Sequence, residues 1–323
     1  MGKQFPLKFI KSVKMKKRFL ILIVTLVAAS SYAQQDSQFT NYMYNTININ
    51  PAYAGSRGVL SIFGLHRNQW VGLDGAPVTN TFSLNTPINN SNFGIGISIV
   101  NDRIGPSDEN SISADISYSI PFSEKYKLSF GVKGTANLLN VDFRKLNIYN
   151  PSDNLAQYNV DSKFSPNVGA GVYFHSNKTY FGLSVPNFLE TKHFDKNESS
   201  FSSESVASER MHYYFIAGHV FDISGNIKLK PAVLTKLVQG APLQVDLSAN
   251  FLFNDKFTIG AAYRWDAAVS LLAGFQISDS WFMGYGYDME VTKLANYNSG
   301  SHEIFLRYEL FKNYDKVVSP RFF

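Results

Sequence analysis

The sequence predicts an all-β protein: a transmembrane antiparallel β-barrel of about 14 strands that follows a cleaved signal peptide. Beyond the leader, polar and apolar residues alternate with a period of two over most of the chain, which indicates amphipathic strands. Charged residues make up 17% of the chain and aromatic residues 15%, whereas about 25% of an ordinary soluble domain is charged. Low charge with many aromatic residues is typical of a lipid-facing band with aromatic girdles.

The charge balance separates the leader from the rest of the chain. The full sequence has 30 Lys and Arg against 25 Asp and Glu, a net charge of +5. Residues 1–33 contain seven basic residues and no acidic one, so the remainder carries a net charge of −2. This distribution argues against a nucleic-acid partner, which would require a basic domain. The absence of cysteine excludes disulfides, thiol catalysis and cysteine-ligated metal sites.

Residues 1–33 have the order of features found in a signal peptide. A basic stretch at 14–18 precedes an apolar run at 19–29, and small residues then lead to an expected cleavage between Ala33 and Gln34. The apolar run of 11 residues is shorter than the roughly 20 that a membrane-spanning helix needs. We therefore expect a mature chain that begins at Gln34, translated from either Met1 or Met15.

Residues 34–57 precede the first predicted strand and form a separate, periplasmic N-terminal segment. Its aromatic and Asn-rich part, residues 38–58, has neither a helical period nor a strand period, and Asn50-Pro51 marks a turn. Two placements are open. The Tyr and Asn side chains either fill the lower lumen as a plug or present a docking surface to the periplasm.

Residues 58–311 form the predicted barrel. In the run 111–122 the even positions, such as Ile112 and Ile116, are apolar, while the odd positions are Ser, Asp or Pro. Elsewhere the second face is built of small residues, as at Gly94 and Gly96, which predicts lipid outside and a crowded or wet lumen inside. The predicted strands cover 58–66, 78–87, 92–101, 111–122, 125–138, 166–175, 179–186, 211–222, 227–236, 242–253, 256–264, 267–277, 281–289 and 301–311.

The predicted connections alternate between short and long. The even-numbered ones are brief, and four odd-numbered ones are long, at 67–77, 139–165, 186–210 and 290–300. Outer-membrane barrels with both termini in the periplasm show this alternation, although the short connections at 237–241 and 265–266 break it. A periplasmic β-sandwich would also show many alternating strands, but it does not explain so many aromatic residues with so few charges. Residues 312–323 remain as a C-terminal tail.

The sequence contains no motif that predicts catalysis, a cofactor or a metal. Its six His residues are scattered singly, and His302-Glu303 lacks the second His of a zinc-binding helix. The run 284–286 and the run 169–171 carry glycines without the third glycine and helix of a dinucleotide site, so lumen-facing or bend glycines are expected there. We therefore predict no enzyme, with a hydrolase at the barrel rim as the least favoured alternative.

Several spaced motifs resemble the PorP/SprF family of type IX secretion outer-membrane proteins. The first is the run 50–55, which is followed by motifs at 67–72, 75–77, 230–231, 240–242, 245–247, 263–265, 274–277, 284–288 and 300–304. The signature residues, expected to be structural or to contact partners, are Asn50, Pro51, Tyr53, Gly55, Gln69, Trp70, Ala76, Pro77, Trp265, Tyr285, His302 and Glu303.

The resemblance implies an outer-membrane barrel of Bacteroidota that works with the type IX secretion machinery. Family members of this kind are needed for secretion or surface attachment of a cognate cargo, often a gliding adhesin, whose C-terminal domain they receive. The expected partners are therefore the machinery, the cargo and outer-membrane lipid. The alternative is an outer-membrane channel or transporter for small or hydrophobic solutes, since a barrel of about 14 strands is wide enough for a small-molecule path.

Overall fold

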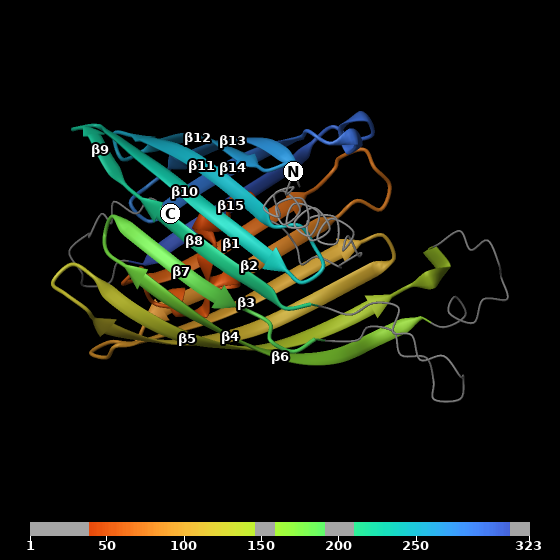
Figure 1. Cartoon of the computed structure of the whole chain (residues 1–323), viewed down its shortest axis with the longest axis horizontal. Helices are drawn as coiled ribbons and strands as arrows, with labels where there is room; N and C mark the ends of the chain where they lie inside the picture. The colour runs from red at the N-terminus through yellow and green to blue at the C-terminus, as the bar shows by residue number, and fades with distance from the viewer. Residues whose placement is uncertain (1–38, 146–158, 191–209, 311–323) are drawn as a thin grey trace, which may run out of the picture.

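The computed structural model describes residues 39–145, 159–190 and 210–310, and these form one closed antiparallel barrel (Figure 1). Apart from β8 and β9, each strand pairs with its neighbours in sequence, and β1 pairs with β15 from Leu60↔Leu310 to Asn68↔His302, which closes the wall. β8 and β9 both pair with β10, so they form two parts of one stave, separated at Val220. The barrel therefore has 14 staves, which confirms the predicted fold class and strand number.

The strand bounds follow the predicted alternation closely along most of the chain. They are β1 (Leu60–Asn68), β2 (Val78–Pro87), β3 (Phe93–Ile104), β4 (Ser107–Pro121), β5 (Lys127–Val141), β6 (Val160–His175), β7 (Thr179–Val185), β8 (His212–His219), β9 (Phe221–Ser224), β10 (Ile227–Val238), β11 (Gln244–Phe253), β12 (Phe257–Arg264), β13 (Ala268–Gln276), β14 (Trp281–Glu290) and β15 (Ser301–Leu310). Short helices lie at η3 (Phe143–Lys145) and η5 (Lys293–Asn296). Among these described residues, no helix has the length and apolar character to span a bilayer.

Two predicted connections are wrong in extent. The alternation predicts a loop over 139–165, but β5 continues to Val141 and β6 begins at Val160. Likewise β3 and β4 continue until only residues 105–106 separate them. The extensions of β3, β4 and β6 are rich in polar residues and so lack the alternation that marks a strand in lipid, and the short extension of β5 puts Leu139 and Val141 inward, yet their backbones pair with one another. The tail 312–323 and the expected cleavage site at Ala33 and Gln34 lie outside the described residues.

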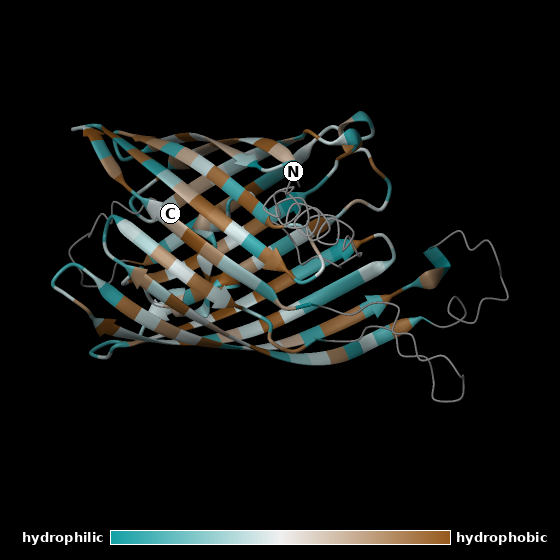
Figure 2. Ribbon diagram, viewed as in Figure 1, coloured by the Kyte–Doolittle hydropathy of each residue, from teal (hydrophilic) through white to brown (hydrophobic). Residues whose placement is uncertain are grey.

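The two faces of the wall differ as the period-two pattern predicts. Stripes of apolar and polar residues alternate along the strands (Figure 2). Outward residues such as Ile116, Val132 and Leu271 are more than half exposed, whereas Gly94 and Gly96 face the lumen and are buried. Because lipid surrounds a membrane barrel, an exposed apolar face is the stable arrangement there.

The barrel has two unlike ends. At the turn end, short connections join β2 to β3, β4 to β5, β6 to β7, β9 to β10, β11 to β12 and β13 to β14. The opposite, loop end carries the longer connections, including residues 69–77 and 291–300. Exposed aromatic pairs lie near the turn end, with ring centroids 4.9 Å apart for Phe93–Tyr118 and 4.7 Å apart for Trp281–Tyr308. They form part of an aromatic girdle on that side.

The hydrophobic core lies inside the barrel and is built around the N-terminal segment. We call residues 39–57 the plug segment; it contains η1 (Tyr42–Tyr44), α2 (Thr46–Ile49) and η2 (Pro51–Tyr53). Nearly all of its residues are buried in one cluster with inward side chains such as Phe282 and Phe305. Of the two placements that the sequence leaves open, the described residues occupy the lumen.

Candidate functional site

The upstream end of the plug segment is bound to a buried charged cluster, the seam anchor, made of Thr40, Asn41, Arg67, Asp288 and Glu303. The Glu303 carboxylate accepts from the backbone N–H groups of Thr40 (3.0 Å) and Asn41 (2.8 Å) and from the Asn41 amide (2.6 Å). Arg67 pairs with Asp288 at 2.7 Å and with Glu303 at 3.2 Å. The Thr40 hydroxyl donates to Asp288 at 2.6 Å and accepts from Arg67 at 2.9 Å.

The strand register explains why these residues meet. Arg67 and Glu303 are cross-strand partners on β1 and β15, and both face inward, as does Asp288 on β14. Arg67 and Glu303 are each only 1% exposed. A buried guanidinium beside two carboxylates would leave a net negative charge, which the N–H groups of the plug segment help to stabilise. The anchor is therefore complete only when the plug segment is seated.

Further along, the plug segment rests on glycines of the wall, which we call the glycine seat: Gly94 (β3), Gly131 (β5) and Gly171 (β6). A Cβ atom at Gly94 would lie 2.2 Å from the Ala54 carbonyl oxygen, and one at Gly131 would lie 2.2 Å from the Ala52 nitrogen. A Cβ atom at Gly171 would lie 2.1 Å from the Asn50 side-chain oxygen. Since real Cβ atoms do not approach so closely, the backbone neighbours of Gly94 and Gly131 require glycine there, whereas a side chain at Gly171 would displace the Asn50 side chain.

Hydrogen bonds fix the plug segment on this seat. The Asn50 side chain accepts from the Ala52 N–H at 3.0 Å, which caps η2, and donates to the Val172 carbonyl of β6 at 3.1 Å. The Ser117 hydroxyl donates to the Ala54 carbonyl at 2.7 Å, and the Ser184 hydroxyl donates to the Ile49 carbonyl at 2.6 Å. The carbonyls of a segment too short for regular structure thus find partners on the wall.

The plug segment leaves the lumen at the turn end through a third contact. Arg57 forms an ion pair with Glu309 of β15 and donates to the Tyr53 hydroxyl at 3.4 Å. Both Arg57 and Glu309 are close to the start of β1, so this pair lies where the chain passes from lumen to wall. Three separate contacts therefore hold a segment of fewer than 20 residues.

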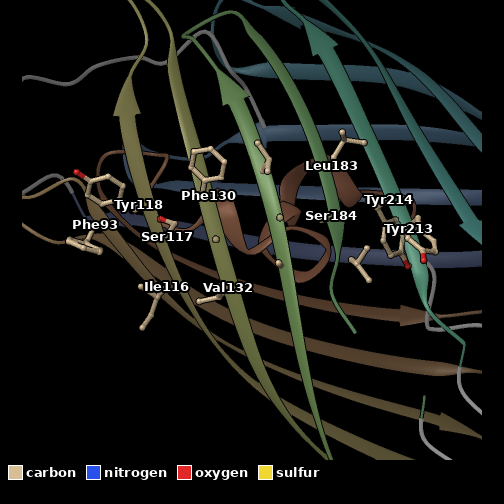
Figure 3. A pocket seen from close by; sticks show the side chains of 15 residues that line it. Phe93, Ile116, Ser117, Tyr118, Phe130, Val132, Leu183, Ser184, Tyr213 and Tyr214 are labelled. Carbon is tan, nitrogen blue, oxygen red and sulfur yellow. The ribbon is translucent and has the colours of Figure 1, made fainter. Parts of the chain in front are cut away.

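A second feature is an apolar hollow on the outer face of the wall, with a volume of about 720 Å³. Phe93 and Tyr118 lie at one side of it and Tyr213 at the other (Figure 3). Small wall residues such as Gly131 and Ala170 also line it. Strands β4, β5, β6 and β7 are continuously paired across this region, so the hollow does not open into the lumen.

Within the described ranges, no group of three or more His, Asp or Glu residues is placed to hold a metal ion. The carboxylates of the seam anchor are instead occupied by Arg67 and by the plug segment. The geometry of the lumen thus supports retention of a segment.

A family model described as "Type IX secretion system membrane protein PorP/SprF" matches residues 31–308. This chain belongs to the PorP/SprF family. The match includes the plug segment and nearly all of the wall, so family membership and the barrel describe the same part of the molecule. Together they place this PorP/SprF protein in the outer membrane, as a membrane component of type IX secretion.

Comparisons with curated proteins give no match. Among solved structures, the chain is similar to the CymD monoaromatic hydrocarbon channel, with 13% identity and a TM-score of 0.48 over 85% of this chain and 94% of that chain. It is also similar to the Acinetobacter baumannii outer membrane protein Omp33, with 7% identity and a TM-score of 0.46 over 78% of this chain and 98% of that chain. At these scores the likeness carries no further weight.

The signature residues of the PorP/SprF family fall into separate places. Asn50, Pro51, Tyr53 and Gly55 belong to the plug segment and its exit, and Asn50 is the residue of this group that contacts the wall most directly. Gly55 has φ +69°, a left-handed conformation, and its hypothetical Cβ would lie 2.8 Å from Gly94, so glycine is required twice over at this position.

Other signature residues lie at the loop end. Gln69 donates through its backbone to Pro77 at 3.0 Å, which closes the β1–β2 loop that also contains Ala76. The indole of Trp70 donates to Glu290 of β14 at 3.2 Å, and Trp70 itself has φ 50°. These residues join the β1–β2 loop to the β14–β15 side of the barrel, near the seam anchor.

The remaining signature residues face outward, with one exception. Trp265 is 63% exposed in the β12–β13 turn. The Tyr285 hydroxyl lies 2.6 Å from His302 Nδ1 on the outer face. Glu303, the next residue, faces inward as the centre of the seam anchor. Adjacent signature residues on β15 thus serve opposite faces, as the pleat of a strand requires.

Sequence reasoning missed Thr40, Asn41, Arg67 and Asp288 as site residues. Arg67 and Asp288 lie within motifs that carry the family resemblance, but nothing in their spacing links them across more than 200 residues of chain. For Asp288 the available signal was its inward position as a charged residue in the predicted strand 281–289, whereas Arg67 lies one residue beyond the predicted strand 58–66, in a segment predicted to be a loop. A charge at an inward position needs a buried partner.

Proposed function

We propose that this protein is a non-catalytic, plugged barrel of the type IX secretion system that holds a cognate exported protein at the outer membrane. Family membership supports the assignment to the secretion system. The observation that carries the non-channel role is the seated plug segment, which is anchored at three points and fills the lumen core. A filled lumen leaves the loops and the outer wall as the surfaces on which a partner can act.

The orientation and partners belong to the same proposal. The turn end faces the periplasm and the loop end faces the cell exterior, as the short and long connections of outer-membrane barrels suggest. The partners are other subunits of the machinery and the C-terminal domain of a cargo such as a gliding adhesin. Outer-membrane lipid contacts the apolar band.

Gene deletion with complementation tests this function. Deletion should abolish surface display of one cognate cargo, measured by surface labelling and mass spectrometry, while other exported proteins still appear. Complementation with the wild-type gene should restore display. If no exported protein changes in abundance at the surface or in the medium, the proposal is wrong.

A second candidate function is transport of small hydrophobic solutes, favoured by the apolar hollow at β3–β8. The paired strands behind the hollow and the plug segment in the lumen weigh against it. Conductance of the purified protein in planar bilayers separates the two functions. A plugged partner barrel should give no steady large channels, whereas a transporter with an open lumen should.

A further inference from the structure

The outer wall carries hydrogen-bonded polar side chains where lipid-facing residues would be expected. We call Tyr285 (β14), His302 (β15), His66 (β1), Asn80 (β2) and Asn101 (β3) the outer polar strip. His66 Nδ1 lies 2.8 Å from the Asn80 side-chain oxygen, and Asn80 donates to Asn101 at 3.4 Å. On the other side of the seam, Tyr285 contacts His302 at 2.6 Å. The strip runs across five adjacent strands that include the closure of the barrel.

Its distance from the aromatic girdle places the strip within the membrane. Trp281 and Tyr308 mark the girdle, and Ile62 is the register partner of Tyr308. Tyr285 lies four residues beyond Trp281, and His66 lies four residues beyond Ile62. Four residues of strand span roughly 13 Å, and less along the membrane normal because strands tilt, whereas the apolar band is about 25 Å tall.

Apolar residues border the strip, so it is not simply the watery edge of the wall. On the outward face of β14, Met283 lies on one side of Tyr285, and Met289 lies beyond Tyr287 on the other side; both Met residues are exposed. The wall away from the strip shows what an ordinary lipid face looks like, with Val132 and Leu183 outward and exposed. The strip is therefore a local departure from an apolar surface.

Polar groups at membrane depth are costly unless they meet hydrogen-bonding partners. The contacts within the strip use only part of its capacity. The Nε2 atoms of His66 and His302 have no hydrogen-bond partner in the described part of the chain, and the Asn80 amide can make more hydrogen bonds than these contacts employ. The Asn101 amide, at the β3 end of the strip, donates instead to Asp108 at 2.8 Å and to Asn110 at 3.0 Å. Lipid chains offer none of the missing partners, whereas another protein surface does.

We propose that the outer polar strip is an interface with a second copy of this chain. Imidazole, amide and phenol groups each donate and accept, and all are neutral when the imidazoles are unprotonated, so the strip is complementary to itself in a two-fold contact. Gly64 lies on the outer face of β1 between Ile62 and His66, and a Cβ there would meet nothing within 4 Å. This small, open position allows two walls to approach closely, as small residues do between membrane helices.

The chain contains no cysteine, so single cysteines report the contact directly. Gly64→Cys places a thiol beside the strip, and Val132→Cys places one on the far wall at an exposed outward position. Mild oxidation of intact outer membranes, followed by non-reducing electrophoresis, should give a disulfide-linked dimer for Gly64→Cys and little for Val132→Cys. Equal yields for the two variants overturn the proposal, as does a Gly64→Cys adduct only with a protein of different mass.

A second experiment removes the hydrogen bonds while keeping the wall apolar. The double variant His66→Leu with Asn80→Leu should weaken self-association in detergent by roughly tenfold, the effect of losing a few membrane-depth hydrogen bonds. Leu183→Met with Leu247→Met, on strands away from the strip, is the matched control, and heat-modifiable migration shows whether each barrel is folded. A folded double variant that associates as strongly as wild type contradicts a second copy at the strip.

Discussion

The plug segment meets the barrel wall by charge at its upstream end and by shape at the glycine seat. At the seam anchor, Glu303 gathers backbone N–H groups and Arg67 into a buried ionic cluster. At the seat, Gly131 and Gly171 simply lack the atoms that would collide with residues 50–52. A charged contact weakens when its charge is removed, whereas a shape contact weakens when an atom is added.

The largest expected effect is at the charged end. Glu303→Gln keeps the size of the side chain but leaves Arg67 with one carboxylate and the Thr40 and Asn41 N–H groups with a weaker acceptor. Breaking a buried ion pair by changing one partner costs about 3–5 kcal/mol. The urea midpoint, the urea concentration at which half of the protein has lost the folded, heat-modifiable band on a gel, should therefore be lower than in wild type.

Asp74→Asn is the control for this change, because Asp74 is an exposed residue of the β1–β2 loop. It makes the same carboxylate-to-amide exchange outside the lumen and should leave the midpoint unchanged. Equal midpoints for Glu303→Gln and wild type would mean that charge does not hold the upstream end.

The second-largest expected effect is at the glycine seat. Valine suits a strand, but Gly131→Val adds a side chain where even a Cβ would lie 2.2 Å from the Ala52 nitrogen. Overpacking of this kind costs about 1–3 kcal/mol or more, and displacement of the plug segment relieves it. We expect faster proteolysis within residues 39–57 and increased bilayer conductance, with the barrel still folded.

Gly134→Val tests whether the effect is specific to the lumen. Gly134 is on the same strand but on the outer face, and a Cβ there would meet nothing within 4 Å. Its proteolysis and conductance should match wild type. If Gly134→Val also released the plug segment, loss of strand glycine in general, rather than a seat, would explain both results.

The sequence predicts the glycine seat better than it predicts the seam anchor. Period-two alternation assigns each residue of a strand to one of two faces, so it places Gly94, Gly96 and Glu303 opposite the outward apolar residues, and the predicted crowded lumen agrees with them. The alternation does not predict which inward residues of different strands lie next to each other. Arg67 meets Asp288 because 14 staves close into a circle, and that proximity depends on register and closure rather than on spacing in the chain.

Two local features also resisted prediction. The break between β8 and β9 at Val220 interrupts a run that alternates without a turn residue. The polar extension of β6 pairs through its backbone with the end of β5, outside the region where lipid imposes an apolar face. In both places the hydropathy pattern says little because side-chain burial does not decide the backbone conformation.

At the glycine seat, Asn50 combines close packing against Gly171 with neutral hydrogen bonds and should have an intermediate effect. Asn50→Ala removes the cap of η2 and the bond to the Val172 carbonyl, while relieving no clash at Gly171. The expected loss is about 1–2 kcal/mol, the typical value for a helix cap and a buried hydrogen bond. Asn50→Asp retains the cap but cannot donate to Val172, so its urea midpoint should differ from that of Asn50→Ala. Identical midpoints would mean that the cap does not contribute to stability.

The smallest effect should come from a single hydroxyl that supplements the seat. Ser117→Ala removes the bond to the Ala54 carbonyl but leaves the adjoining backbone contact at Gly94 intact. A neutral hydrogen bond of this kind contributes about 0.5–1.5 kcal/mol, so the urea midpoint should fall slightly and conductance should stay at the wild-type level. Combined with Gly131→Val, the same change should add little, because a displaced plug segment no longer offers the Ala54 carbonyl to Ser117. Full additivity of the two changes would show that residues 50–54 stay on the wall when the seat is filled, and that hydrogen bonds rather than shape hold this end.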